Sequence, residues 1–265
     1  TYSTFDYSYD DNETVDNVRN LIKPETKLVI CTHASNVFGF RFPIERICAL
    51  CHAYGILFCV DSAQSAGVFD IDVGTNQYDF VCMSGHKSLY GPMGTGVLIL
   101  NNRNLKPLLY GGTGTESVKK SQPEGLPEKF ESGTQNMNGI SGLKAGVDFV
   151  KNRGIKNIYN HEYKLAKRLF NGLANNRKVI TYNKSFDYGK VAPVVSFNID
   201  GVYSEDLVAK LNKYGIMTRG GLHCSPLAHT TMNTIENGTV RVVPGAFNTI
   251  NDINYLLNVI RKLTN

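Results

Sequence analysis

Lys87 is the residue of this chain whose type and position most clearly suggest chemistry. It ends the run Ser84-Gly85-His86-Lys87, which follows the apolar segment 80–83 and precedes a turn-rich stretch at 90–96. A lysine at the end of a buried strand can lie in a partly dry crevice, where its pKa falls and its amine becomes nucleophilic toward a carbonyl. The sequence therefore predicts a Schiff base with an aldehyde cofactor, although a surface lysine is the commoner outcome for this residue type.

Two further apolar runs lead into polar segments of the same kind. Residues 28–31 are followed by Thr32 to Asn36, and residues 56–60 are followed by Asp61 to Gln64. Neither run alternates cleanly between apolar and polar residues, which is typical of strands buried on both faces of a parallel sheet. Right-handed crossovers bring the carboxyl ends of parallel strands to one edge, and ligands bind at that edge. We therefore expect the three polar segments to converge.

The side chains in these segments are of the types that a pyridoxal phosphate site requires. A carboxylate such as Asp61 keeps a pyridine nitrogen protonated, and the amide of Gln64 can donate a hydrogen bond to a ring oxygen. Ser84 and His86 can donate hydrogen bonds to a phosphate group. Asp61 alone would be explained more simply as a helix cap or turn residue. The combination with Lys87 predicts pyridoxal phosphate as the cofactor.

The chain resembles the class V aminotransferases of fold type I, and among them the cysteine desulfurase family. The resemblance covers nearly the whole chain and rests on motifs that occur in family order, the strongest of which is Arg219 to Leu227. The other motifs are residues 32–37, 60–64, 84–87, 91–96 and 130–136. The resemblance implies an α/β fold, in which a mainly parallel sheet with flanking helices is followed by a smaller C-terminal α+β domain.

The resemblance also implies the roles of the cofactor residues. Lys87 binds the cofactor covalently, Asp61 pairs with the pyridinium nitrogen, and Gln64 contacts the ring hydroxyl oxygen. Ser84 and His86 bind the phosphate. The cofactor site is therefore expected at the ends of two neighbouring strands.

Substrate and partner contacts are implied in the same way. Asn36, which also belongs to the cofactor site, and Arg241 hold the substrate carboxylate, while Arg219 contacts the substrate or orients its loop instead. Thr134 reaches the cofactor phosphate of a partner subunit across a homodimer interface. Cys224 accepts the sulfur.

Cys224 differs from the other cysteines in its surroundings. It lies in the segment Gly-Gly-Leu-His-Cys-Ser-Pro, which is too rich in glycine and proline for a helix or strand. We therefore expect a reactive loop cysteine, whose thiolate Arg219 and His223 nearby could favour. Four others lie within apolar runs and are expected to be structural: Cys31, Cys48, Cys59 and Cys82.

Cys48, Cys51 and His52 have the spacing of a c-type haem attachment site. The apolar residues Ile44 and Ile47 recur with the two cysteines at helical spacing. This pattern places both cysteines on the apolar stripe of a helix, so a structural role is favoured over haem or zinc, and no metal site is expected.

A change in pattern near residue 138 divides the chain into a partial cofactor-binding domain, 1–138, and a connecting helix with a small domain, 139–265. Helices are predicted at 140–150, 158–173 and 204–214, and Thr249 and Asp252 form a capping box for a last helix. Strands are predicted at four places: 179–182, 191–199, 216–219 and 239–243.

Bulk composition excludes several classes of protein. The 265 residues are 42% hydrophobic and carry a net charge of +5 without a dense basic block, so nucleic-acid binding is not expected. No apolar stretch is long enough to cross a bilayer, so no membrane association is expected. Six scattered cysteines and a polar first segment without signal-peptide character predict a cytoplasmic protein.

We therefore expect a pyridoxal phosphate-dependent cysteine desulfurase that converts L-cysteine to L-alanine and passes a persulfide sulfur to an acceptor protein. The resemblance links this activity to sulfur metabolism and iron–sulfur cluster assembly. A selenocysteine lyase or another class V aminotransferase remains an alternative, as does a catalytically inactive interaction protein. A nucleotide-binding domain is disfavoured because no Gly-x-Gly-x-x-Gly turn follows an early strand.

Members of the family carry a further segment before the point at which this sequence starts. That segment includes a Gly-Thr turn at a helix N-terminus that binds phosphate and a histidine that stacks on the cofactor ring. The sequence is thus expected to be part of a longer chain. It is also expected to have unpaired sheet edges and to bind pyridoxal phosphate poorly when isolated.

Overall fold

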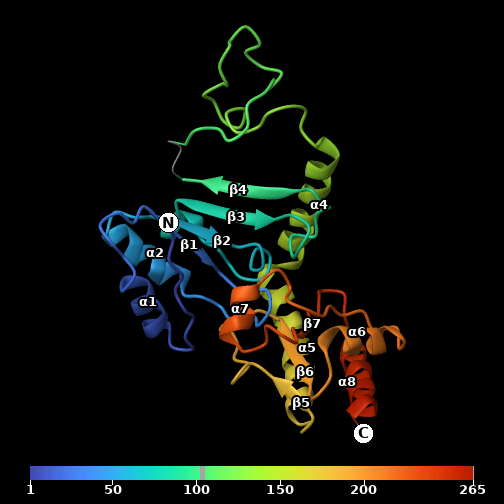
Figure 1. Cartoon of the computed structure of the whole chain (residues 1–265). Helices are drawn as coiled ribbons and strands as arrows, with labels where there is room; N and C mark the ends of the chain where they lie inside the picture. Colours follow the sequence, from blue (N-terminus) through green and yellow to red (C-terminus); the bar gives the residue numbers. More distant parts are fainter. Residues whose placement is uncertain (102–104, 265) are drawn as a thin grey trace.

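The computed structural model describes residues 1–101 and 105–264, which form two sheets with a hydrophobic core against each (Figure 1). The first sheet has the spatial order β1 (Leu28–Thr32), β2 (Leu57–Asp61), β3 (Phe80–Ser84) and β4 (Gly96–Leu100). The strands β1, β2 and β3 are parallel, and β4 runs antiparallel to β3. The expected mainly parallel sheet is confirmed, and β4 is an addition that the glycine-rich stretch before it did not predict.

One face of the first sheet is covered by helices. The helices α1 (Asp11–Arg19) and α2 (Ile44–Ala53) pack their apolar side chains against β1, β2 and β3. The third helix, α3 (Val73–Asn76), is a single turn that Asp72 caps. Cys48 and Cys51 lie inside this core, as the helical interpretation predicted.

The opposite face of the first sheet is exposed at its centre. The side chains of Ile30 and Leu98 are 62% and 53% exposed, and Cys82 between them is also exposed. The register pairs Asp61 with Cys82, and Ser84 lies two residues farther along β3. Since side chains alternate between the faces of a strand, Asp61 and Ser84 belong to this exposed face.

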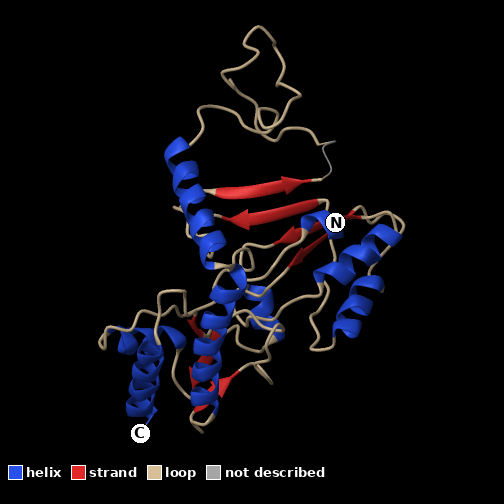
Figure 2. Cartoon of the chain, turned by 180° about the vertical axis from the view of Figure 1, so that it is seen from behind, coloured by secondary structure: helices blue, strands red, loops and turns tan. Residues whose placement is uncertain are grey.

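Two long helices lead from the first sheet to the second (Figure 2). The first, α4 (Met137–Arg153), runs beside the sheet, where its Leu143 packs against Ala66 and Leu89. It ends at Gly154, and α5 (Ile155–Ala174) begins at the next residue. The described segment between β4 and α4 forms a loop that extends away from the sheet (Figure 1).

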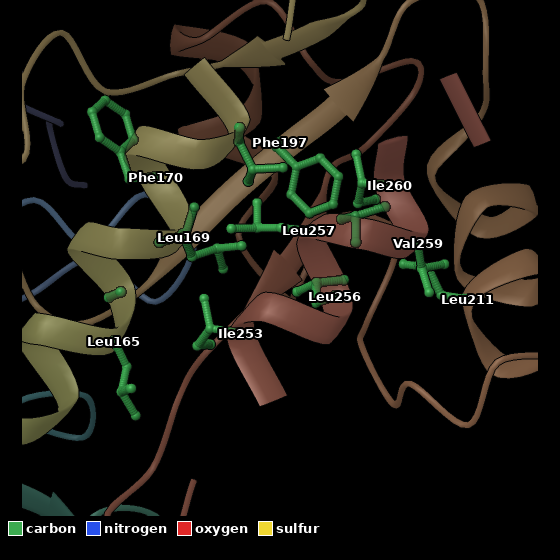
Figure 3. Packing of buried hydrophobic residues seen from close by; sticks show 14 of the residues in the cluster. Leu165, Leu169, Phe170, Phe197, Leu211, Ile253, Leu256, Leu257, Val259 and Ile260 are labelled. Atoms are coloured by element: carbon green, nitrogen blue, oxygen red, sulfur yellow. The ribbon is translucent and has the colours of Figure 1, made fainter. Parts of the chain in front are cut away.

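The second sheet is antiparallel, in the order β5 (Val179–Thr181), β6 (Val195–Ile199) and β7 (Val240–Val242). Side chains of α5 and of α8 (Ile250–Thr264) interlock with Phe197 of β6 in its core (Figure 3). The predicted capping box of α8 is present, because the Thr249 N–H donates to Asp252 Oδ2 at 2.8 Å. The helices α6 (Ser204–Asn212) and α7 (Pro226–Thr231) complete this part.

The predicted strand at 216–219 was wrong. Only Arg219 forms a bridge, to Arg241 of β7, and Met217 is 93% exposed. Glycines on both sides, at 215 and at 220–221, let the backbone turn away before a second residue can pair. The predicted strand at 191–199 is present only from Val195 onward.

Candidate active site

Lys87 lies three residues beyond the end of β3, in a tight turn. The Gly91 N–H donates to the Gly85 carbonyl at 2.8 Å, and the Tyr90 N–H donates to the Lys87 carbonyl at 2.9 Å. The Lys87 side chain keeps contact with solvent, but neighbouring protein atoms remove part of the water around its ammonium group. This desolvation lowers the pKa of Lys87, as the sequence analysis predicted.

Three other charged or reactive groups lie close enough to Lys87 to act on its pKa. The Asp61 carboxylate and the Cys224 sulfur raise it, and the Arg241 guanidinium lowers it. These groups come from the end of β2, from a loop before α7 and from β7, so they are far apart in the sequence. The fold thus brings the predicted lysine, carboxylate, arginine and cysteine into one region.

Lys87 lines a pocket of about 290 Å³ between the two sheets. Gln64 and Arg241 also line it, as predicted, and Tyr90 and Glu162 are further lining residues. Asp61 does not line this pocket and approaches Lys87 from the exposed face of the first sheet.

The predicted cofactor residues Asp61, Ser84 and His86 lie at the ends of β2 and β3. Asp61 Oδ1 accepts a hydrogen bond from the Ala63 N–H at 2.9 Å, the ordinary role of a turn aspartate. Its Oδ2 receives no hydrogen bond from the described residues, so one carboxylate oxygen can face a ligand. Ser84 Oγ and His86 Nδ1 lie 3.2 Å apart, so the two groups that the sequence analysis predicts to bind phosphate are side by side.

The first polar segment reaches the site through Asn36 and not through His33. His33 is fully buried, and its Nε2 accepts a hydrogen bond from Arg41 Nε at 3.1 Å. Burial lowers the pKa of His33 to about 3, so its ring stays neutral and is a part of the packed interior.

Asn36 ties the cysteine loop to β7. Its Nδ2 donates to the His223 carbonyl at 2.7 Å, and its Oδ1 accepts from Ser225 Oγ at 2.7 Å. Arg241 NH1 donates to the Asn36 carbonyl at 2.7 Å. The predicted substrate residues Asn36 and Arg241 are therefore in direct contact, and the amide of Asn36 holds the loop that carries Cys224.

Cys224 is exposed on a strained loop. His223 and Cys224 have φ angles of 51° and 61°, in the left-handed region that side chains other than glycine rarely adopt. Arg219 NH2 lies 3.9 Å from Cys224 Sγ. The predicted proximity of Arg219 and Cys224 is confirmed, and the backbone presents the thiol to solvent.

The expectation that His223 favours a thiolate was wrong. His223 is 3% exposed, and its Nε2–H donates to the Thr239 carbonyl at 2.9 Å. Burial lowers the pKa of His223 to about 4, so the ring is neutral and supplies no positive charge to Cys224. Adjacent residues of an irregular loop can point in opposite directions, so the closeness of His223 to Cys224 in the sequence did not show that the ring is buried.

Thr134 lies outside the region of Lys87. It is exposed in the segment just before α4 and does not line the pocket. Its contact with a partner subunit stays a prediction.

A family model described as "Aminotransferase class-V" matches residues 5–256 of the chain. The chain belongs to the class-V aminotransferase family. Its fold, with a mixed sheet and flanking helices, is that of the family's solved structures. It is similar at a TM-score of 0.87 and 34% identity to the apo structure of a cysteine desulfurase from Thermococcus onnurineus NA1, covering 94% of this chain and 62% of that one.

Curated relatives give the same picture. The chain is 36% identical over 246 residues to a probable cysteine desulfurase of Pyrococcus abyssi, and the match covers 89% of this chain and 59% of the relative. It is 34% identical over 254 residues to a probable cysteine desulfurase of Halalkalibacterium halodurans, covering 94% and 61%. The chain thus spans about three fifths of the length of the curated relatives that it matches.

Sequence analysis of this class-V chain missed Glu162, a buried carboxyl on α5 that lines the pocket. Glu162 is 3% exposed, and burial raises its pKa to about 7. A signal was present, because Glu162 falls on the apolar stripe of its helix, four residues after Ile158 and three before Leu165. An acidic residue on such a stripe indicates a buried polar contact.

The described residues, 1–101 and 105–264, contain neither a membrane-spanning helix nor a metal-binding cluster. No helix there combines the length and apolar character that a membrane crossing needs. No group of three or more His, Cys, Asp or Glu side chains in residues 1–101 and 105–264 could hold a metal ion.

Proposed function

We propose that this chain carries the catalytic lysine and the sulfur-accepting cysteine of a pyridoxal phosphate-dependent cysteine desulfurase. The reaction converts L-cysteine to L-alanine and leaves the sulfur as a persulfide on Cys224. The observation that carries the proposal is the convergence of Asp61, Arg241 and Cys224 on the Lys87 amine. The similarity to proteins named cysteine desulfurases supports it.

The residues of the site fit pyridoxal phosphate. Lys87 offers an amine of lowered pKa for the cofactor aldehyde, and Asp61 offers an unpaired carboxylate oxygen for the pyridinium nitrogen. Ser84 and His86 offer adjacent donors for the phosphate, and Gln64 offers an amide for the ring hydroxyl. When bound, the cofactor supplies an electron-withdrawing ring that lowers the cost of removing the α-proton of an amino acid.

The side chains of the pocket then divide the remaining tasks. The planar guanidinium of Arg241 suits a bidentate grip on the substrate carboxylate, and Asn36 holds that arginine in place. The lowered pKa of Lys87 makes its Nζ available to accept the α-proton. The Cys224 thiolate attacks the substrate sulfur, so an S–S bond forms as the C–S bond breaks, and the carbon takes the electron pair and a proton to become alanine.

The proposal includes a partner subunit and a sulfur acceptor. A second copy of the chain would receive Thr134 at its cofactor phosphate, and an acceptor protein would take the sulfur from the exposed Cys224. Six free cysteines support a reducing compartment such as the cytoplasm. Delivery of sulfur to iron–sulfur cluster assembly fits such an acceptor.

Two substitutions test the assignment in the protein loaded with pyridoxal phosphate. Cys224→Ala is expected to abolish sulfur release from L-cysteine while preserving the absorbance band of the lysine-bound cofactor. Lys87→Ala is expected to remove that band. Cys48→Ala is the matched control, because Cys48 lies in the core between α2 and the other face of the first sheet, and it should retain sulfur release. Loss of both readouts in the Cys224 variant would show a structural role, and a persistent band without Lys87 would refute the lysine assignment.

The isolated 265 residues are expected to bind pyridoxal phosphate poorly. Asp61 and Ser84 lie on a sheet face whose centre is exposed, so the cofactor would be open to water on one side. A spectrum of the isolated chain with pyridoxal phosphate tests this point. A lysine-bound band of full intensity would contradict the expectation of weak binding and leave the residue assignments standing.

A further inference from the structure

Tyr90 joins the turn that carries Lys87 to two other elements. We define the lysine turn as residues 85–91, which two backbone hydrogen bonds close. Tyr90 Oη donates to Glu162 Oε1 on α5 at 3.3 Å and accepts from the Ala246 N–H, beyond β7, at 3.3 Å. The phenol thus contacts the loop between β7 and α8 and, at the same time, the buried carboxyl of α5.

The backbone of Tyr90 is held in an unfavourable conformation. Its φ angle is 56°, in the left-handed region where a residue with a side chain is strained by about 1 kcal/mol or more. The ring packs against Phe149 and Phe247, with centroid distances of 4.9 and 5.9 Å. A tyrosine at a position that would suit glycine indicates that the side-chain contacts stabilise the turn more than the backbone strain destabilises it.

Glu162 is the buried end of this connection. A buried carboxyl is costly unless it is hydrogen-bonded, and Tyr90 is its side-chain donor among the described residues. The charged group that faces the pair from α4 is Arg153, whose NH2 also donates to the Ala246 carbonyl at 3.1 Å. The neighbouring His161 faces elsewhere, toward the Asn248 carbonyl at 2.9 Å.

Glu162 is not among the charged groups that shift the pKa of Lys87. Glu162 lines the same pocket as Lys87 and Arg241, yet the charges that act on the lysine come from Asp61, Arg241 and Cys224. Among the described residues, Glu162 is linked to Lys87 by its hydrogen bond to Tyr90 and then by the backbone of the lysine turn.

We propose that Glu162 is a positioning residue that, through Tyr90, fixes the lysine turn relative to Arg241 on β7. The same phenol contacts both Glu162 and Ala246, so the pair sets the separation between the amine and the guanidinium across the pocket. The inference rests on the proposed function in one respect: that the distance between the two groups matters because Lys87 binds the cofactor and Arg241 binds the substrate carboxylate. The positioning itself is a property of the chain alone.

Hydrogen–deuterium exchange tests the positioning without any cofactor. Tyr90→Phe and Glu162→Ala are expected to speed exchange of the Tyr90 and Gly91 amides by about tenfold or more, because the turn then opens locally. Glu162→Gln is expected to restore slow exchange, since its amide oxygen can still accept from the phenol. Tyr163→Phe is the matched control, because it removes a hydrogen bond from α5 to the Phe186 carbonyl and leaves the lysine turn untouched.

Each outcome decides the inference. Faster exchange confined to α5, or equal acceleration in the Tyr163 control, would show that Glu162 has only a structural role and would overturn the proposal. If Glu162→Ala fails to fold, Tyr90→Phe decides, because it removes the same link with a smaller change of volume. When pyridoxal phosphate is titrated in, Glu162→Ala is expected to need about tenfold more cofactor than the unmodified protein to reach half of the maximal lysine-bound absorbance. Glu162→Gln is expected to need the same amount as the unmodified protein. Absence of that band in the unmodified protein would refute the proposed function and leave the exchange result to decide the positioning.

Discussion

Replacing Glu162 by glutamine should change how the stability of this protein depends on pH. The carboxyl is 3% exposed, and burial, which Tyr90 and Arg153 only partly offset, raises its pKa from the ordinary 4.5 to about 7. Glutamine has nearly the same shape and keeps an oxygen that accepts from the Tyr90 phenol, but it does not titrate. The substitution therefore removes one titration and little else.

The sign and the size follow from the two pKa values. Below pH 4.5 the carboxyl is protonated in the folded and the unfolded chain, so it favours neither. Between pH 4.5 and about 7 the unfolded chain releases the proton and the folded chain holds it, so a rise in pH favours unfolding. Each pKa unit corresponds to about 1.4 kcal/mol, so the total loss from this group is roughly 3 kcal/mol by pH 8.

Urea unfolding of the two proteins at pH 4, 5, 6, 7 and 8 measures this effect. Other carboxyls, such as Asp72 and Asp252 with lowered pKa values, are common to both proteins and cancel in the difference. The free energy of unfolding of Glu162→Gln relative to the parent should rise by roughly 3 kcal/mol from pH 4 to pH 8. A difference that stays flat across this range would show that Glu162 titrates normally, and the buried-carboxyl reasoning would fail.

Two further predictions concern packing and accessibility. Gly67→Ala should destabilise the chain by about 2 kcal/mol or more in urea unfolding. The backbone at Gly67 has a φ of 83°, and a Cβ there would lie 2.1 Å from the Ser88 carbonyl oxygen. Gly112→Ala is the control and should be nearly neutral, because a Cβ at Gly112 would have no atom within 4 Å. A thiol reagent should label Cys82 in the native chain and leave Cys31, which is 2% exposed, unlabelled until unfolding; equal labelling rates would contradict the fold of the first sheet.

Much of the fold could be predicted because local pattern and tertiary structure agree. The apolar runs before Asp61 and Lys87 are parallel strands, and the stripe that begins at Ile158 is a long buried helix. The capping box at Thr249 forms because both of its hydrogen bonds are local. Such features depend on a few neighbouring residues, so the sequence specifies them directly.

The failures share a different cause, which is tertiary context. The strand β4 (Gly96–Leu100) follows directly on a turn-rich stretch, and its antiparallel pairing depends on the free edge that β3 offers. His223 is two residues from the glycine pair and one from Cys224, yet it faces the core and hydrogen-bonds to Thr239. Glu162 is functional only because the lysine turn folds against its helix. None of these contacts is encoded within a short window.

The exposed sheet face has an electrostatic consequence for Asp61. An attraction between two unit charges 4 Å apart amounts to about 1 kcal/mol in bulk water and about 4 kcal/mol at an effective dielectric constant of 20, which is typical near a protein surface. The carboxylate lies on the same face as Ile30 and Leu98, where solvent reaches the centre of the sheet. A second layer of polypeptide over these strands would lower the effective dielectric constant there, so the strength of the proposed pair between Asp61 and a pyridinium would depend on residues that touch neither partner.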